Sequence, residues 1–336
     1  VAPKDALMEF GLRRAQGHSA GLWGARAAMI GGFNGTSNVE AGKRFGIPVL
    51  GTMAHSWVMS FDEEIDAFRE YVRQYHDNLI LLADTYNVLE MGVPHAIQVF
   101  KELKEEGRLP GKYGIRIDSG DIAYLSQEAT RMFTEAGFPD AIISGSNDLD
   151  EYTIQSLKAQ GCTVTSWGVG TKIITADGTS ALGGVFKMAV KEADGKEVPV
   201  MKFSNDVEKM TNPGIKTVYR FYKKDTGKMI TDLVCLHDEK AADGGDFTLV
   251  TESAKWRRKE LKAGTYTVEE LLKPVVENGR NLPLPALSEI IRYADKQIDT
   301  LWPEYTRLLN PDLMEINLSD KLQTLKSELI RRELGE

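Results

Sequence analysis

Residues 113–121, Tyr113-Gly114-Ile115-Arg116-Ile117-Asp118-Ser119-Gly120-Asp121, form an apolar run of strand type that ends in a charged and polar cluster. Such clusters recur along the chain roughly every thirty residues, with helical patterns between them. In a barrel of β/α units the residues that follow the strands meet at the carboxyl edge of the sheet. The sequence therefore predicts an α/β fold whose site binds an anionic, phosphate-rich ligand. The other clusters are Gly51–His55, Ala83–Thr85, Ser144–Asp148 and Gly168–Thr171.

The pattern of apolar and polar residues changes after about Gly184. Before this point strand and helix patterns alternate, with strands expected at 47–50, 78–83, 113–117, 141–143 and 164–167 and helices at 39–45, 61–75, 93–106, 122–136 and 149–160. After it, short alternating strands are expected at 185–191, 198–203, 217–222 and 229–235, followed by helices at 287–300 and 318–334. We predict a β/α catalytic domain at 1–184 and a smaller β-rich region with C-terminal helices at 185–336.

Composition limits the classes of function. The net charge of −8 over 336 residues offers no basic stripe, which argues against a nucleic-acid partner. Cys162 and Cys235 match no metal-ligand spacing and indicate a reducing cytoplasm. No apolar run reaches the length of a membrane span. The chain starts at Val1, nine residues before a site-like motif, and we expect it to lack an amino-terminal segment.

His55 is the histidine that stands out, because it follows a predicted strand and a turn of small residues. A histidine in this position can be a base, a metal ligand or a nucleophile that accepts a phosphoryl group. The alternative is a hydrogen-bonded histidine at the rim of a barrel. The strand-end position favours a functional role.

Arg116 and Asp118 are two residues apart on a predicted strand, so both side chains point to the same face. If this face is the barrel interior, the guanidinium can hold a planar carboxylate and the aspartate can hold a metal. A structural ion pair inside the barrel is the alternative. Asp121 precedes a predicted helix and is expected to cap it.

Two further features suit a phosphorylated ligand. The loops Ser144–Asp148 and Gly168–Thr171 follow successive strands, and their backbone amides can converge on a phosphate. The run Phe10-Gly11-Leu12-Arg13-Arg14 places an aromatic side chain beside two cations, which suits an aromatic ring and a pyrophosphate. As a bare pattern, this run is equally typical of a basic pair on the surface.

Taken together, these motifs closely resemble those of the nicotinate phosphoribosyltransferase family, in the expected order. The resemblance extends from about residue 7 to about residue 190 and continues more loosely through Asn310-Pro311 and 318–334. It implies a type II phosphoribosyltransferase with an irregular TIM-like β/α barrel and a second, smaller α/β domain built from the chain ends. The motifs that carry it are Met8–Gln16, Gly51–Val58, Arg116–Asp121, Ser146–Glu151 and Trp167–Thr171.

The resemblance also implies the reaction and its partners. Members join nicotinate to phosphoribosyl pyrophosphate, giving nicotinate mononucleotide and pyrophosphate, with ATP as co-substrate and Mg²⁺ as cofactor. This implies a role in NAD biosynthesis, in the cytoplasm. We expect a homodimer whose site is shared between subunits, or a partner chain that supplies the segment before Val1.

Individual roles follow from the motif positions that match. By resemblance, His55 is the histidine that ATP phosphorylates, Thr52 and Arg116 contact nicotinate, and Phe10 stacks on its ring. Arg13 and Asp118 are implied to handle the pyrophosphate and its Mg²⁺, with Asp118 also counted as catalytic. The implied phosphoribosyl cradle consists of Gly145, Asn147, Asp148, Gly168, Gly170 and Thr171.

Three other functions compete with this one. Nicotinamide phosphoribosyltransferase typically has an aspartate where this chain has Ser37, and a carboxylate there would repel nicotinate, so serine favours the acid substrate. Quinolinate phosphoribosyltransferase lacks an ATP-linked histidine and fits less well. A barrel that only binds a phosphorylated metabolite would need the cradle, but it would not need His55.

Overall fold

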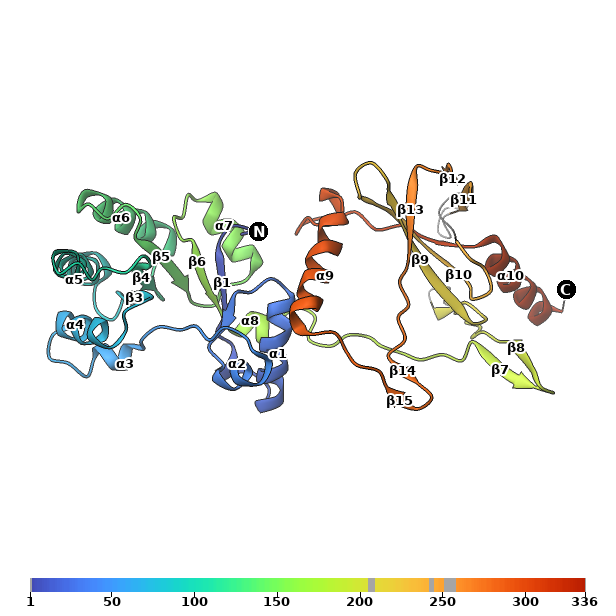
Figure 1. Ribbon diagram of the computed structural model, residues 1–336, viewed down its shortest axis with the longest axis horizontal. Coiled ribbons are helices and arrows are strands. Elements are labelled where there is room, and N and C mark those ends of the chain that lie inside the picture. Colours follow the sequence, from blue (N-terminus) through green and yellow to red (C-terminus); the bar gives the residue numbers. More distant parts are fainter. Residues whose placement is uncertain (1, 205–208, 242–244, 251–257, 336) are drawn as a thin grey trace. The chain divides into compact units, whose positions relative to one another are not determined.

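The structure is a computed structural model that describes residues 2–204, 209–241, 245–250 and 258–335. The chain divides into two compact units, Val1–Leu182 and Gly183–Glu336, each with its own sheet (Figure 1). Each unit is described by itself below. Among the described residues, no helix has the length and apolar character that crossing a bilayer requires.

A six-stranded parallel sheet forms the centre of the first unit. Its hydrogen-bonded order is β2-β1-β6-β5-β4-β3, and each neighbouring pair is parallel. In the described part of the chain β2 and β3 end this order and do not pair with each other. The parallel α/β arrangement expected from the sequence is therefore confirmed, as an open sheet. Its strands are β1 (Ala6–Glu9), β2 (Gly35–Thr36), β3 (Leu79–Leu82), β4 (Tyr113–Ile117), β5 (Ile142–Ser146) and β6 (Ser166–Val169).

Helices follow the strands, as parallel crossovers require. They are η1 (Leu12–Arg14), α1 (His18–Ile30), α2 (Val39–Phe45), α3 (His55–Val58), α4 (Glu64–Gln74), η2 (Val88–Gly92), α5 (Val93–Glu105), α6 (Ile122–Glu135), α7 (Glu151–Ala159) and α8 (Thr171–Ile174). Local signals set several boundaries. Asn38 and Asp121 cap α2 and α6 by accepting the backbone N–H groups of Ala41 and Tyr124, and the cap at Asp121 was predicted from the sequence.

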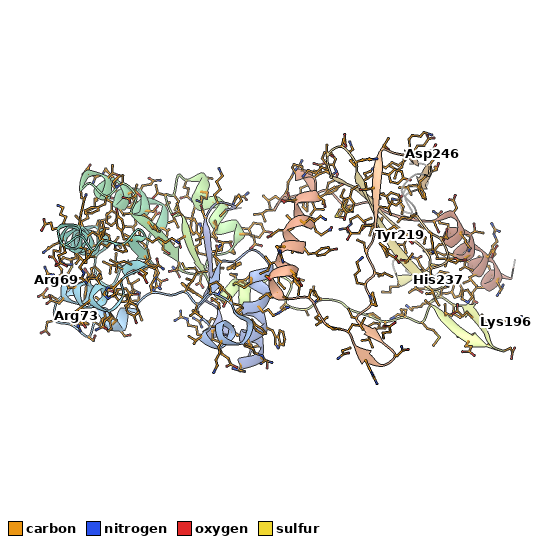
Figure 2. The ribbon with its side chains drawn as sticks, in the orientation of Figure 1. Arg69, Arg73, Lys196, Tyr219, His237 and Asp246 are labelled. Atoms are coloured by element: carbon orange, nitrogen blue, oxygen red, sulfur yellow. The ribbon has the colours of Figure 1, made fainter. Side chains whose placement is uncertain are left out.

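The hydrophobic core of this unit lies between the sheet and helices α4, α5 and α6. Every residue of β3 is buried, and Phe68, Phe100 and Phe133 bring one aromatic ring from each of the three helices. The opposite face of α4 is polar, with Arg69 and Arg73 on its outer side (Figure 2). The Arg69 Nη2 lies 2.7 Å from the Glu102 Oε1, so an exposed ion pair also joins α4 to α5.

Several features of the first unit differ from the sequence prediction: β1 and β2 were not predicted, and β5 and β6 continue through Ser146 and Val169 into the predicted loops. Residues 47–50 do not form a buried strand: Val49 makes a single bridge to Thr36 and is half exposed. Its apolar side chain covers the α2 glycine Gly42 instead. The helix α1 was not predicted, because Gly21 and Gly24 interrupt its pattern. A Cβ at Gly21 would meet the Leu12 Cδ1 at 2.7 Å and one at Gly24 would meet the Ile174 Cδ1 at 2.4 Å, so a larger residue at either position would require the end of that side chain to move.

The second unit is rich in antiparallel strands, as expected, although β16 joins its largest sheet in parallel. This sheet has the order β13-β9-β10-β16, with β9 (Lys216–Lys223), β10 (Met229–Leu236), β13 (Tyr266–Glu270) and β16 (Ile316–Leu318). The described residues of the unit also include further antiparallel strand pairs and helices. They are β7 (Val190–Ala193) with β8 (Lys196–Pro199), β11 (Phe247–Val250) with β12 (Arg258–Leu261), β14 (Val276–Glu277) with β15 (Arg280–Asn281), α9 (Leu287–Thr300), η4 (Pro303–Tyr305) and α10 (Asp320–Leu334).

Some strand limits of this unit were predicted wrongly. The first hairpin turns at Asp194-Gly195, where both residues have positive φ. Its strands, however, are shorter than the predicted ranges 185–191 and 198–203. Val185 and Phe186 have exposed side chains, so no packing supports a strand there. Cys162 and Cys235 are both free and buried, which agrees with the absence of a disulfide signal.

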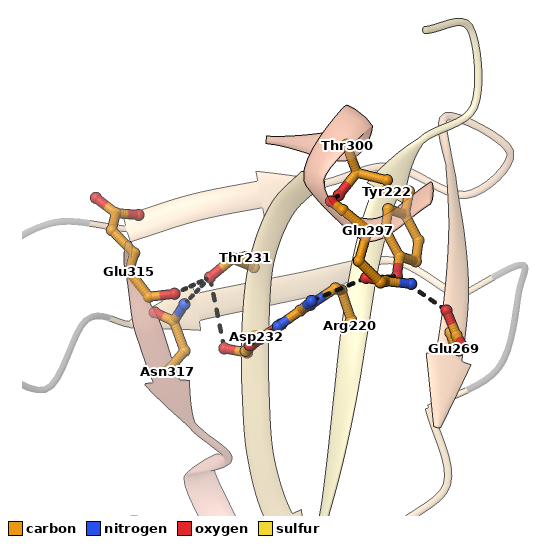
Figure 3. Close-up of polar contacts among 9 residues, drawn as sticks. All are labelled: Arg220, Tyr222, Thr231, Asp232, Glu269, Gln297, Thr300, Glu315 and Asn317. Atoms are coloured by element: carbon orange, nitrogen blue, oxygen red, sulfur yellow. Dashed lines mark hydrogen bonds and ion pairs between the residues drawn. The ribbon is translucent and has the colours of Figure 1, made fainter. Parts of the chain in front are cut away.

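A polar network ties α9 to the four-stranded sheet (Figure 3). The Arg220 guanidinium donates from Nε and Nη2 to the two Asp232 oxygens, each at 2.8 Å, and from Nη1 to the Gln297 side chain at 3.0 Å. The Tyr222 hydroxyl donates to the Glu269 carboxylate at 2.9 Å. Burial is the main cause that raises the pKa of Tyr222 to about 12. This network specifies how the outer helix lies on the strands.

Replacing Arg220 with methionine is expected to destabilise the second unit by about 2–4 kcal/mol, because Asp232 would remain buried without its cation. Hydrogen exchange of β9 and β10 peptides measures this effect, and β4 and β5 peptides of the same sample are the internal reference. The matched control is Arg131→Met, which removes exposed pairs with Glu128 and Glu135 and should cost below about 1 kcal/mol. Equal effects of the two changes would contradict this role of Arg220.

Candidate active site

A pocket of about 300 Å³ lies at the carboxyl edge of the parallel sheet. It collects residues from β4, β5 and β6 and from the segments that follow these strands and β1, and three of the five predicted clusters contribute to it. Three arginines and two aspartates give its wall a net positive charge in a chain of net charge −8. The lining residues are Phe10, Arg13, Arg14, Arg116, Asp118, Ser146, Asn147, Asp148, Gly168, Gly170 and Thr171.

Arg116 is the buried cation of the pocket, with a side chain 13% exposed. Its Nη1 donates to the Thr52 hydroxyl at 2.6 Å, and its Nη2 lies 3.8 Å from the Asp118 Oδ2. Its Nε is buried and has no partner among the described residues. Burial lowers the pKa of Arg116, and the charges of Asp118 and Asp84 oppose this. The guanidinium is thus oriented by Thr52 and keeps a donor available for an anion.

Asp118 lies at the centre of the polar groups. The Ser146 hydroxyl donates to its Oδ1. Its backbone N–H donates to the Asp84 Oδ2 at 2.9 Å, and the Ser119 hydroxyl donates to the same oxygen at 2.6 Å. The side chain of Asp84 is almost fully buried, and its Oδ1 has no hydrogen-bond partner in the described residues. Asp84 therefore fixes the turn after β4 on which Asp118 stands.

His55 opens α3 and reaches this aspartate pair. Its Nε2 lies 3.9 Å from the Asp84 Oδ1 and 3.8 Å from the Asp118 Oδ2, and its Nδ1 is 3.1 Å from the Thr85 hydroxyl. The ring is 39% exposed, so one side remains accessible. This geometry brings together three of the sequence clusters, at 51–55, 83–85 and 116–121.

Tight backbone packing shapes the opposite wall. A Cβ on Gly168 would lie 2.6 Å from the ring of Phe10, and one on Gly170 would lie 3.2 Å from the Phe10 carbonyl oxygen. Asn147 and Asp148 have φ values of 102° and 37°, in the left-handed region that is costly for residues with a side chain. Strained backbone of this kind is concentrated at ligand sites.

Four of the predicted residues, Ser37, Thr52, His55 and Gly145, lie outside this lining. Thr52 acts through its bond to Arg116. Ser37 follows β2, and its backbone N–H donates to the Glu9 carbonyl at 2.9 Å. Gly145 faces the core, where an added Cβ would contact Val164 and Trp167. The four-residue helix α8 begins at Thr171.

Comparison with known proteins identifies the family. The family model for the nicotinate phosphoribosyltransferase (NAPRTase) family matches residues 6–240, and the model for the nicotinate phosphoribosyltransferase C-terminal domain matches residues 215–326. The chain belongs to the nicotinate phosphoribosyltransferase family. The first match alone covers more than half of the chain, including every pocket residue.

Relatives with this name include one from Bacillus subtilis (strain 168), 41% identical over 98% of this chain, and one from Caenorhabditis elegans, 33% identical over 95% of this chain. The chain spans 66% of the length of each of these relatives. The crystal structure of human nicotinic acid phosphoribosyltransferase superposes with a TM-score of 0.76 at 28% identity, covering 96% of this chain and 70% of that one. A nicotinate-nucleotide pyrophosphorylase from Pyrococcus furiosus shares the fold at a TM-score of 0.63 and 22% identity, covering 89% of this chain and 67% of that one.

Sequence reasoning did not single out several residues that the structure places at the site. Asp84 and Ser146 lie within quoted clusters, and Arg14 lies in the motif with Arg13, so their positions were visible but their partners were not. Glu9 was quoted only as part of a family motif. Its buried position becomes apparent only with Thr36 beside it.

The aspartates of the pocket wall fit a metal ion that binds together with a phosphorylated ligand. In the described ranges no three histidine, cysteine, aspartate or glutamate side chains form a metal-binding group. Mg²⁺ usually takes one or two carboxylates and completes its shell with phosphate oxygens and water. Asp118 and Asp148, both at the pocket wall, fit this mode of binding.

Proposed function

We propose that this chain carries the site at which nicotinate is joined to phosphoribosyl pyrophosphate, giving nicotinate mononucleotide and pyrophosphate. Membership of the family supports this function. The observation that carries it is the buried Arg116, whose Nε lacks a partner beside a pocket walled by two more arginines and by glycine-rich loops. Such a site offers one oriented cation for a carboxylate and separate groups for phosphates.

The nicotinate end of the site is assigned to Arg116, Thr52 and Phe10. Nε and Nη2 of Arg116 provide two donors for the pyridine carboxylate, while Nη1 stays on Thr52. Phe10, held against Gly168, offers an aromatic face for the ring. In the reaction the ring nitrogen forms a bond to the anomeric carbon, and the bond from that carbon to the pyrophosphate oxygen breaks.

The phosphate end is assigned to Arg13, Arg14 and the loops after β5 and β6. Negative charge grows on the leaving pyrophosphate in the transition state, and fixed cations placed there stabilise it more than the ground state. Backbone amides of residues 147–148 and 170–171, just past the ends of β5 and β6, are proposed as additional donors to the phosphoribosyl group. Mg²⁺ held by Asp118 would neutralise pyrophosphate oxygens when bound.

His55 is proposed to accept the phosphoryl group of ATP. The carboxylates of Asp84 and Asp118 lie nearest to Nε2 and favour the tautomer with its proton there. The Nδ1 lone pair then accepts from the Thr85 hydroxyl, and once this hydrogen bond is released it attacks the terminal phosphorus of ATP, with ADP as the leaving group. The new negative charge beside two aspartates would couple ATP to the state of the site.

The finer architectural expectations also remain proposals. We propose that the six-stranded sheet is the larger part of an irregular TIM-like barrel, and that the second unit belongs to a second α/β domain. A cytoplasmic homodimer with shared sites, or a complex in which a partner chain completes them, agrees with the family resemblance. The boundaries near residue 184 follow the division at Leu182 and Gly183.

The direct test is formation of nicotinate mononucleotide by the purified protein with nicotinate, phosphoribosyl pyrophosphate and Mg²⁺, with and without ATP. We expect product in both cases and a stimulation by ATP. Faster turnover of nicotinamide than of nicotinate would favour the amide-specific enzyme instead. Binding of phosphoribosyl pyrophosphate without any product would indicate a sensor.

Changing Ser37 to aspartate is expected to shift substrate choice toward the amide. Two like charges within about 4 Å cost roughly 1–4 kcal/mol depending on the local dielectric, so nicotinate should bind more weakly. Nicotinamide should be spared, because its amide can donate to the new carboxylate. The measurement is the ratio of kcat/KM for the two substrates, with Ser37→Asn as the isosteric neutral control. An unchanged ratio would assign specificity to Arg116.

A further inference from the structure

Glu9, the last residue of β1, carries a fully buried carboxylate in the first unit. The backbone N–H of Gly11 donates to its Oε1, and the Thr36 hydroxyl donates to its Oε2 at 2.5 Å. Within the described part of the chain, no lysine, arginine or histidine forms an ion pair with it. Both oxygens are therefore held by neutral donors from two different loops.

A buried carboxylate without a paired cation at the end of a strand lowers the folding stability of the unit. Desolvation of the charge costs several kcal/mol, and two neutral hydrogen bonds recover only part of this. An apolar side chain would satisfy the core at lower cost. The position is thus better explained by what the carboxylate holds than by the stability of the sheet.

The first segment that Glu9 holds carries the aromatic residue and the cations of the pocket. Gly11 approaches so closely that a Cβ there would lie 2.8 Å from the Glu9 Oε1 and 2.4 Å from Ile174. Phe10 directly precedes Gly11 and Arg13 follows it two residues later, and both residues line the pocket. The carboxylate therefore sets where this turn leaves the sheet.

The second segment contains Ser37. The Thr36 Oγ1 that donates to Glu9 also accepts the Asn38 N–H at 3.0 Å, and the Ser37 N–H donates to the Glu9 carbonyl at 2.9 Å. Asn38 in turn caps α2. The side chain and the backbone carbonyl of Glu9 thus join the loop after β1 to the end of β2 and the loop that follows it.

We propose that Glu9 is a positioning residue that fixes one rigid wall of the site, by holding the aromatic-cation turn (residues 10–14), which lines the pocket, to the Ser37 loop (residues 36–38), which lies outside the lining. Its effect on turnover rests on the proposed function; its effect on loop order does not. Because the wall touches both ends of the site, loss of the carboxylate should weaken both substrates together.

The variants are expected to differ in how much they raise KM. Glu9→Ala should raise KM for nicotinate and for phosphoribosyl pyrophosphate by about 10–100-fold each, the range for losing hydrogen bonds to a charged group. Glu9→Gln should be milder, because its amide oxygen can accept from Gly11 and its NH₂ can donate to Thr36. Thr36→Val, which removes one of the two donors, should fall between wild type and Glu9→Ala.

The decisive experiment is hydrogen exchange by mass spectrometry on the same variants, with no substrate present. Glu9→Ala should accelerate exchange in peptides covering residues 10–16 and 34–39 and leave β3 and β4 peptides unchanged, with partial rescue in Glu9→Gln. Glu40→Gln, an exposed acid on α2 that contacts His18, is the matched control and should change nothing. Should Glu9→Ala fail to fold, Glu9→Gln and Thr36→Val carry the same test.

The outcomes separate this inference from the proposed function. Unchanged exchange in both loops, or an increase spread evenly over the whole unit, would overturn the positioning role even if the enzyme is active. Local loosening in a protein that makes no nicotinate mononucleotide would sustain the positioning role and overturn the proposed function. A rise in KM for only one substrate would show that the two loops are not coupled.

Discussion

Replacing His55 with alanine is expected to abolish the phosphorylated form of the protein and the stimulation of turnover by ATP. The ring lies against both Asp84 and Asp118, and a phosphoryl group on one of the neighbouring hydroxyls would be distinguished from it by its stability to acid. Wild-type protein incubated with ATP and Mg²⁺ should carry an acid-labile, base-stable phosphoryl group at His55, detected by intact mass and peptide mapping. The ATP-dependent increment in rate should fall by at least about 100-fold.

His76→Ala is the matched control for this prediction, because His76 is an exposed histidine outside the pocket lining. Its phosphorylation and turnover should equal those of wild type. Phosphate retained in His55→Ala would refute the assignment of the acceptor. Loss of the phosphoryl group with an undiminished response to ATP would refute the coupling role instead.

Replacing Arg116 with lysine is expected to reduce kcat/KM for nicotinate by roughly 30–1,000-fold. This corresponds to a loss of about 2–4 kcal/mol in transition-state binding. Lysine keeps the charge but loses the planar fork, so it cannot hold Thr52 and also present two donors to a carboxylate. The loss should be concentrated in nicotinate, whereas the KM for phosphoribosyl pyrophosphate should change little. Steady-state kinetics with each substrate varied in turn measures this split.

Arg108→Lys controls for the substitution itself, since Arg108 is half exposed and pairs with Glu106 away from the site. It should leave both KM values unchanged. A near wild-type kcat/KM for nicotinate in Arg116→Lys would contradict recognition of the carboxylate by this fork. Equal losses for both substrates would place Arg116 among the residues that shape the whole pocket.

Where the sequence predicted an element well, the signal was local. The strand at 113–117 and the helices at 39–45 and 287–300 have the predicted limits, because their apolar patterns mark them and, for the helix at 39–45, Asn38 and Gly46 mark the two ends. The prediction of a strand at 47–50 was wrong because a strand also depends on a partner that is distant in the sequence. A short apolar run does not reveal whether a strand neighbour exists, and here Val49 finds only one bridge.

The polar clusters could be predicted to meet because parallel strands all end at one edge of a sheet. By itself, therefore, the sequence determined the parallel α/β class, the family motifs and most residues of the pocket wall. The tertiary structure alone decided which groups are partners: Asp84 with the turn of Asp118, Glu9 with Thr36, and an Arg116 Nε left without one. These pairings join residues about thirty positions apart, and their burial and geometry depend on how the strands are aligned, which no local pattern records.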